Sequence, residues 1–174
     1  MASQYIIDSN VFIQGKNFHY HFSFCQGFWD WVRIGFDRGL IYSIGKVRAE
    51  LIAGKKDDEA RVWAEQMPDG FFLDDTSDAS VMAEYGHVMD WAAADTQYQQ
   101  AALARFAEAK RADAFLLAYA RAHGHIIVTQ ELSQPTKRKE VPIPDAAIKI
   151  GGVRTIPIYD LLRTHARSTF TFKP

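Results

Sequence analysis

The N-terminal segment reads Tyr5-Ile6-Ile7-Asp8-Ser9-Asn10. Its three apolar residues favour a strand and its last three favour a turn, so the segment predicts a short strand that ends at Asp8. A second segment, Ile126-Ile127-Val128-Thr129-Gln130-Glu131, has the same form. Its unbroken apolar run is typical of a strand buried on both faces. We therefore expect two buried strands, each followed by an acidic residue.

Helical patterns separate these strands along the chain. They cover residues 24–36, 45–53, 57–67, 77–94, 98–110, 113–123 and 159–165, and further short strands are expected at residues 40–42, 71–73 and 154–158. Ser43 is a candidate N-cap for the second of these helices. Strands that alternate with helices predict a three-layer α/β/α fold, in which helices flank a central, mostly parallel sheet. A length of 174 residues fits one such domain over residues 1–174.

The composition limits the classes of function. The 20 Lys and Arg residues nearly balance the 21 Asp and Glu residues, which argues against a protein that coats nucleic acid without specificity. Cys25 is the only cysteine, so an internal disulfide and a cysteine-rich zinc site are excluded. The sequence shows neither a signal-peptide pattern nor an apolar run long enough to cross a bilayer. We therefore expect a cytoplasmic protein without a membrane partner.

Four acidic residues are expected at one edge of the sheet. Asp8 and Glu131 follow strands, and the carboxyl ends of parallel strands share an edge where ligands bind. Asp113 begins the helix that leads into the strand before Glu131, so roughly 16 Å of helix and roughly 20 Å of extended chain return to the same edge. Glu50 lies on the helix after the second strand and has the least constrained position.

Converging carboxylates imply a cation. Burying carboxylates together without a partner costs several kcal/mol each, because the charges lose water and repel one another. A site built only from oxygen ligands favours Mg²⁺ or Mn²⁺ over zinc. Such ions activate water and stabilise in-line attack on a phosphodiester. The pattern therefore indicates a metal-dependent phosphodiester hydrolase.

Three segments, taken in order, resemble the PIN nuclease superfamily. They are Tyr5-Ile6-Ile7-Asp8-Ser9-Asn10-Val11-Phe12-Ile13, then Ser43-Ile44-Gly45-Lys46-Val47-Arg48-Ala49-Glu50-Leu51, then Ala112-Asp113-Ala114-Phe115-Leu116-Leu117-Ala118-Tyr119-Ala120 with the strand before Glu131. The closest resemblance is to the PIN-like DUF4411 group, which the stretch Val141-Pro142-Ile143-Pro144-Asp145 also resembles. Many PIN proteins are toxins of bacterial type II toxin–antitoxin pairs, which cut RNA with Mg²⁺ or Mn²⁺. The resemblance thus implies an RNA substrate and a cognate antitoxin protein.

The resemblance also assigns roles to single residues. Asp8, Glu50 and Asp113 match the metal-binding acids of the family. Asn10 and Thr129 match its supporting polar positions.

The fourth acid is open between two residues. The family has an aspartate two residues after the threonine, and this chain has Glu131 there, whose longer side chain can still reach a metal. Asp145 is the alternative fourth carboxylate, or else the N-cap of a short helix over residues 146–149. The basic run Lys137-Arg138-Lys139 follows closely, either as a solvated loop or as a grip on RNA phosphates.

Each acid also has a purely structural interpretation. Asp8 can cap a turn, and Glu50 can pair with Lys46 one helical turn earlier. Asp113 can merely favour the dipole of its helix. Glu131 can be an exposed loop acid.

The leading hypothesis is a metal-dependent endoribonuclease that acts as a toxin. Asp8, Glu50, Asp113 and Glu131 would hold the metal, and the bridging 3′ oxygen would leave. One alternative is a PIN or flap-type nuclease that acts on DNA or structured RNA, and another is a catalytically degenerate nucleic-acid-binding module. A homodimer is also considered, because dimers are common among similar toxins and the aromatic helix at residues 24–36 can support one.

Overall fold

The computed structural model describes residues 3–174, and its centre is a five-stranded sheet. The strands are β1 (Tyr5–Ile7), β2 (Ile41–Ile44), β3 (Phe72–Leu73), β4 (Ile126–Val128) and β5 (Arg154–Ile156). Their order is β3-β2-β1-β4-β5, and every neighbouring pair is parallel. Tyr5 lies opposite Ile41 on one side and Ile126 on the other. The predicted α/β fold is confirmed.

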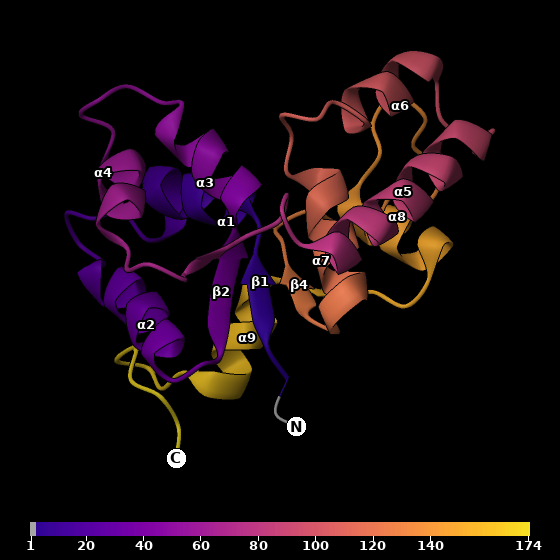
Figure 1. The fold of residues 1–174 in the computed structure, drawn as a ribbon. Helices are drawn as coiled ribbons and strands as arrows, with labels where there is room; N and C mark the ends of the chain where they lie inside the picture. Colours follow the sequence, from indigo (N-terminus) through magenta and orange to yellow (C-terminus); the bar gives the residue numbers. More distant parts are fainter. Residues whose placement is uncertain (1–2) are drawn as a thin grey trace.

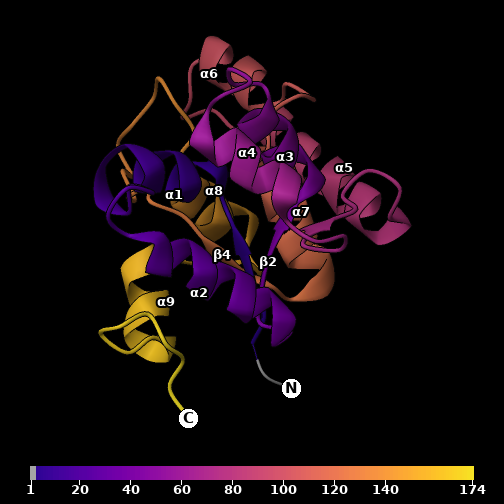
Figure 2. The ribbon, with the colours of Figure 1, turned by 90° about the vertical axis from the view of Figure 1, so that its left-hand side faces the viewer.

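Helices cover both faces of this sheet. They are α1 (Ser9–Gln14), the π-helix η1 (Gly15–His19), α2 (Gln26–Asp37), α3 (Gly45–Ile52), α4 (Glu59–Gln66), α5 (Ala79–Ala94), α6 (Gln100–Phe106), α7 (Asp113–His123), α8 (Ile143–Ile150) and α9 (Ile158–His165). Figures 1 and 2 show α1 to α4 on one side of the sheet and α5, α7 and α8 on the other. Within residues 3–174, none of these helices is both long enough and apolar enough to span a membrane.

Aromatic side chains hold the first of these layers against the sheet. Phe12 of α1 lies 6.2 Å from Trp29 of α2 and 4.9 Å from Trp63 of α4, measured between ring centroids. Phe12, Trp29 and Phe71 are fully buried in the same cluster. Burial of such rings is the largest apolar contribution that single side chains make to a core. The cluster therefore fixes α1 directly behind β1, and with it the position of Asp8.

The sheet reverses its direction of growth between β1 and β4. The chain builds β2 and β3 on one side of β1 and then returns to build β4 and β5 on the other. Asp8 N donates to Val128 O at 2.9 Å, and Thr129 N donates to Ile156 O at 3.0 Å, so both residues lie at the carboxyl ends of neighbouring strands. In open parallel sheets this reversal is where ligands bind.

The segment after β1 differs from the predicted turn. A helix begins directly at Ser9, and residues 15–19 continue as η1. Burial of Val11 and Phe12 outweighs the turn preference of the polar residues before them. The helix predicted at residues 24–36 begins at Gln26, and Phe24 is 72% exposed outside it.

Two predicted N-caps are wrong. Ser43 lies in β2, where its hydroxyl donates to Ile7 O at 2.6 Å, and the N-cap position of α3 is Ile44. Asp145 lies in the first turn of α8, because that helix begins at Ile143 after Pro142. In contrast, the helix predicted at residues 113–123 is confirmed, and Gly124 ends it in the left-handed conformation with φ 72°.

Candidate functional site

Asp8 is buried at the end of β1 and is held by a network around Thr129. Asp8 is 3% exposed, and its Oδ2 accepts a hydrogen bond from Thr129 Oγ1 at 2.9 Å. The same hydroxyl oxygen accepts from Asn10 Nδ2 at 3.0 Å and from Glu131 N at 3.1 Å. Because these two donors occupy its lone pairs, the single hydroxyl proton points to Asp8. Asn10 and Thr129, the predicted supporting residues, thus orient the first acid.

Glu50 connects the end of β1 with the start of α7. Its Oε2 accepts from Ser9 Oγ at 2.6 Å, and its Oε1 accepts from Ala112 N at 2.9 Å. Ser9 Oγ also lies 3.4 Å from Asp8 Oδ1, so the hydroxyl bridges two acids. Ala112 immediately precedes Asp113 in the chain. Glu50, which had the least constrained position in the sequence, is therefore held beside both aspartates.

Lys46, the alternative partner of Glu50, contacts a different residue. Among residues 3–174, no ion pair joins Glu50 to Lys46. Lys46 Nζ instead lies 4.7 Å from the ring centroid of Phe115. The structural interpretation of Glu50 as one half of a surface pair is therefore wrong.

Asp113 and Glu131 complete the group of acids. Asp113 begins α7, and its Oδ2 lies 3.6 Å from Arg111 Nη2. Glu131 follows β4, and its Oε2 accepts from Ile143 N at 2.6 Å at the start of α8. Glu131 is half-buried, which contradicts its interpretation as an exposed loop acid. The four acids thus come from four separate segments of the chain.

Asp145 forms hydrogen bonds to the loop that follows Glu131. It is buried, and its two carboxylate oxygens accept from Ser133 Oγ at 2.5 Å and Gln134 N at 2.7 Å. Both bonds shape the loop that follows Glu131. Of the two candidates for the fourth acid, Glu131 is the one whose charge acts on Asp8 and Asp113.

The acids affect one another's ionisation. Burial raises the pKa of Asp8 well above its ordinary value, and the carboxylates of Asp113, Glu131 and Glu50 raise it further, whereas the Thr129 hydrogen bond lowers it. Burial likewise raises the pKa of Asp113, against the opposing effect of Arg111. Burial also raises the pKa of Glu131, and Asp113 adds to that shift. The site therefore concentrates negative charge that its own cations do not balance.

The residue types gathered here suit a divalent cation. The donors are all carboxylate oxygens, the ligands that Mg²⁺ and Mn²⁺ prefer. Within residues 3–174, however, no group of three or more His, Cys, Asp or Glu side chains is close enough to form a ligand set. The protein donors described above occupy both oxygens of Glu50 and one oxygen of Glu131.

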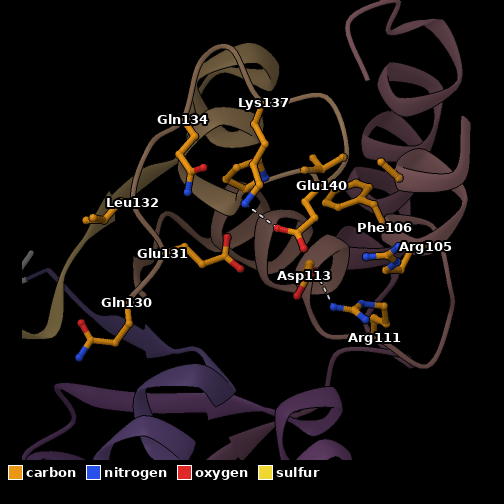
Figure 3. A pocket seen from close by; sticks show the side chains of 13 residues that line it. Arg105, Phe106, Arg111, Asp113, Gln130, Glu131, Leu132, Gln134, Lys137 and Glu140 are labelled. Carbon is orange, nitrogen blue, oxygen red and sulfur yellow. Dashed lines mark ion pairs between the residues drawn. The ribbon is translucent and has the colours of Figure 1, made fainter. Parts of the chain in front are cut away.

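A pocket of about 420 Å³ opens beside Asp113 and Glu131. Figure 3 shows Arg105, Arg111 and Lys137 in its wall, together with Glu140. The predicted basic run is thus divided. Lys137 lines the pocket, whereas Arg138 and Lys139 are exposed outside its lining, and Arg138 Nε donates to Gln97 O at 3.2 Å.

The sequence interpretation missed three residues of this region. Ser9 lies inside the first quoted segment, and Arg111 stands two residues before Asp113, so both were within reach of a closer study of the motifs. Arg105 belongs to α6, and no local pattern connects that helix with the acids.

Comparison with known families covers nearly the whole chain. The model of a domain of unknown function, DUF4411, matches residues 5–170. The chain belongs to the DUF4411 family. No curated protein matches it. All four acids of this DUF4411 domain, the Thr129 network and the pocket lie inside the matched residues.

Proposed function

We propose that this DUF4411 domain is a PIN-type, metal-dependent endoribonuclease that hydrolyses RNA phosphodiester bonds. One observation carries the proposal: the charges of three further acids from distant segments act on a buried aspartate at the reversal point of a parallel sheet. Folding alone gives no reason to gather like charges at a place where they oppose one another's ionisation. A function that needs the charges explains the arrangement.

Asp8, Glu50, Asp113 and Glu131 would hold Mg²⁺ or Mn²⁺. A divalent ion held there supplies an activated water and positive charge for the phosphate oxygens. The reaction breaks the bond between phosphorus and the bridging 3′ oxygen, joins the oxygen of water to phosphorus, and transfers a proton to the leaving oxygen.

The side chains of the domain hold the acids in place for this reaction. Thr129 directs its proton to Asp8, Ser9 donates to Glu50, and the N–H of Ile143 donates to Glu131. Groups that are already oriented lose less free energy to reorganisation during the reaction. Arg111 and Lys137 add positive charge beside the acids, which reduces their repulsion of an RNA phosphate.

The resemblance to PIN toxins extends the proposal to a biological role. In that role the domain is the toxin of a type II pair, and a cognate antitoxin protein holds it inactive. The segments of the chain that carry the resemblance are the ones that supply Asp8, Glu50 and Asp113.

The deciding experiment replaces one buried acid. Asp8→Asn keeps the shape of the side chain and removes its charge, so we expect Mn²⁺-dependent cleavage of single-stranded RNA to fall by more than about a hundredfold. Thr129→Val should reduce it by roughly 10–100-fold, the usual effect of losing an orienting partner. If the toxin role holds, expression of the wild type arrests growth and expression of Asp8→Asn does not.

Controls separate the competing functions. Asp37→Asn, on the exposed surface of α2, should cleave like the wild type. A substrate panel of single-stranded RNA, tRNA and flapped DNA identifies the substrate class. Full activity of a folded Asp8→Asn variant contradicts the mechanism, and a wild type that neither binds Mn²⁺ in calorimetry nor cleaves favours a degenerate binding module.

A further inference from the structure

Glu140 is an acidic residue placed among three cations. Its carboxylate lies 2.5 Å from Lys137 Nζ, and Figure 3 shows the two side chains pointing toward each other across the pocket. The hydrogen bond and charge of Lys137, and after them the charges of Arg105 and Arg111, hold the pKa of Glu140 below its usual range. The side chain is 55% exposed, so the packed core does not fix it there. An anion is thus favoured at this position, and an exposed side chain supplies it.

Arg111 retains unused capacity to bind an anion. Its Nε is buried and has no hydrogen-bond partner among residues 3–174. Its only ion pair in that part of the chain, with Asp113, is long at 3.6 Å. A guanidinium carries five N–H donors in a planar fork that matches phosphate. The wall of the pocket therefore contains donors that the protein itself does not satisfy.

The position of these cations suits a strand of RNA at the acids. The pocket that Asp113 and Glu131 line is also lined by Arg105, Arg111 and Lys137. A strand that presents one phosphate to the acids must place its neighbouring phosphate a short distance away. Cations at that place would supply the attraction that the acids lack.

We propose that Arg105, Arg111 and Lys137 form a subsite for the backbone phosphate next to the scissile one, and that the Glu140 carboxylate occupies this subsite as an internal competitor until RNA displaces it. This inference rests on the proposed ribonuclease function. It adds Arg105 and Glu140 to the residues that recognise the substrate, and it assigns Arg111 and Lys137 to one particular phosphate. It also assigns Glu140 a negative effect on affinity.

The test measures binding without cleavage. A fluorescein-labelled single-stranded oligoribonucleotide is titrated with the protein in EDTA, and anisotropy is followed at several salt concentrations. Glu140→Gln should bind about two- to fivefold more tightly, the range expected for removing one exposed ion-pair partner. Arg105→Gln and Arg111→Gln should bind more weakly, and each should flatten the dependence of log affinity on log salt by about 0.7.

A second exposed ion pair provides the matched control. Arg33 Nε lies 3.4 Å from Asp37 Oδ1 on α2, with the two side chains 46% and 54% exposed. Figure 1 places α2 on the opposite side of the sheet from α6. Asp37→Asn and Arg33→Gln change the net charge as the pocket variants do, so they should leave affinity and salt dependence near the wild-type values. If Glu140→Gln and Asp37→Asn change the affinity for RNA equally, net charge alone explains the change and the proposed subsite is wrong.

Arg105→Gln is the decisive variant, because Arg105 makes no ion pair with the acids in residues 3–174. Unchanged affinity and salt dependence in Arg105→Gln overturn the subsite, even if the wild type cleaves RNA with Mn²⁺. The expected pattern in a protein that never cleaves supports a phosphate-binding site with Glu140 as its competitor and refutes the nuclease function. A wild type that binds no RNA overturns both.

Discussion

At the scale of single residues, the buried charge of Asp8 lowers the stability of the fold. Its carboxylate is buried, and the other acids around it raise its pKa. In the folded chain the protonated form is therefore favoured more than in the unfolded chain. The contribution of Asp8 to stability is present below its ordinary pKa of 3.8 and is lost as pH rises through the raised folded value.

Replacing Asp8 by Asn should stabilise the metal-free protein at neutral pH. The amide oxygen can still accept from Thr129, and the repelling charge is gone. Because burial and the neighbouring acids disfavour the charged form of Asp8, the free energy of unfolding of the variant should exceed that of the wild type. Urea unfolding in EDTA at several pH values measures it. The difference from the wild type should shrink toward zero as pH falls to 3.8.

A variant of Asp145 is the control for a general effect of removing a buried charge. Asp145 accepts two hydrogen bonds and its loss should destabilise, so Asp145→Asn is expected to unfold at lower urea than the wild type. An Asp8→Asn protein that is less stable at pH 7 would refute the account of Asp8 as a strained charge.

At the scale of elements, α3 shows how a distant segment positions a site residue. The N-cap residue of α3 makes no side-chain cap, and Lys46 N donates instead to Asp75 Oδ2 at 2.7 Å. A Cβ on Gly45 would lie 3.0 Å from Asp75 Oδ1, so glycine there allows the close approach. A carboxylate at a helix N-terminus satisfies free N–H groups and favours the helix dipole. Asp75 thereby fixes the helix that carries Glu50.

Asp75→Ala should affect both stability and cleavage. Loss of a cap costs about 0.5–2 kcal/mol, and a displaced α3 moves Glu50, so we expect RNA cleavage to fall roughly tenfold. Asp78 is the matched control, because it caps α5 by accepting from Ser80 N and Val81 N and contacts none of the four acids. Chemical unfolding and Mn²⁺-dependent cleavage are measured for both variants. Equal cleavage losses in the two would show that stability, not the position of Glu50, is responsible.

At the scale of the whole molecule, the four acids connect segments that are distant in the chain. They follow β1, lie on α3, begin α7 and follow β4. A cation bound by them would hold the two halves of the sheet together, on either side of the reversal point. Binding to the folded state alone raises stability by mass action.

Mn²⁺ should therefore raise the melting temperature of the wild type. At a hundred times its Kd the gain is about 2.7 kcal/mol, and each kcal/mol raises Tm by roughly 2–4 °C in a chain of this size. Differential scanning fluorimetry with Mn²⁺, and then with excess EDTA, measures the shift and its reversal. The double variant Asp8→Asn/Asp113→Asn should show none, and an equal shift in that variant would place the ion elsewhere.

The sequence by itself determined the strands that end at Asp8 and before Glu131 and the helix that begins at Asp113. These features depend on apolar periodicity and on turn-forming residues among neighbours in the chain. Both can be read directly from the sequence. Because parallel strands share an edge, the same patterns also predicted that Asp8 and Glu131 follow the carboxyl ends of neighbouring strands.

Only the tertiary structure decided how those acids are held and which partners surround them. The hydrogen bond from Ser43 to β1 and the cap that Asp75 gives α3 join residues from separate elements. The same is true of the contacts that distinguish Asp145 from Glu131 and of the cations around Glu140. Hydrogen bonds and charges act over distances in space, and the packing of α1, α6 and α8 around the sheet sets those distances. No local pattern in the chain carries that information.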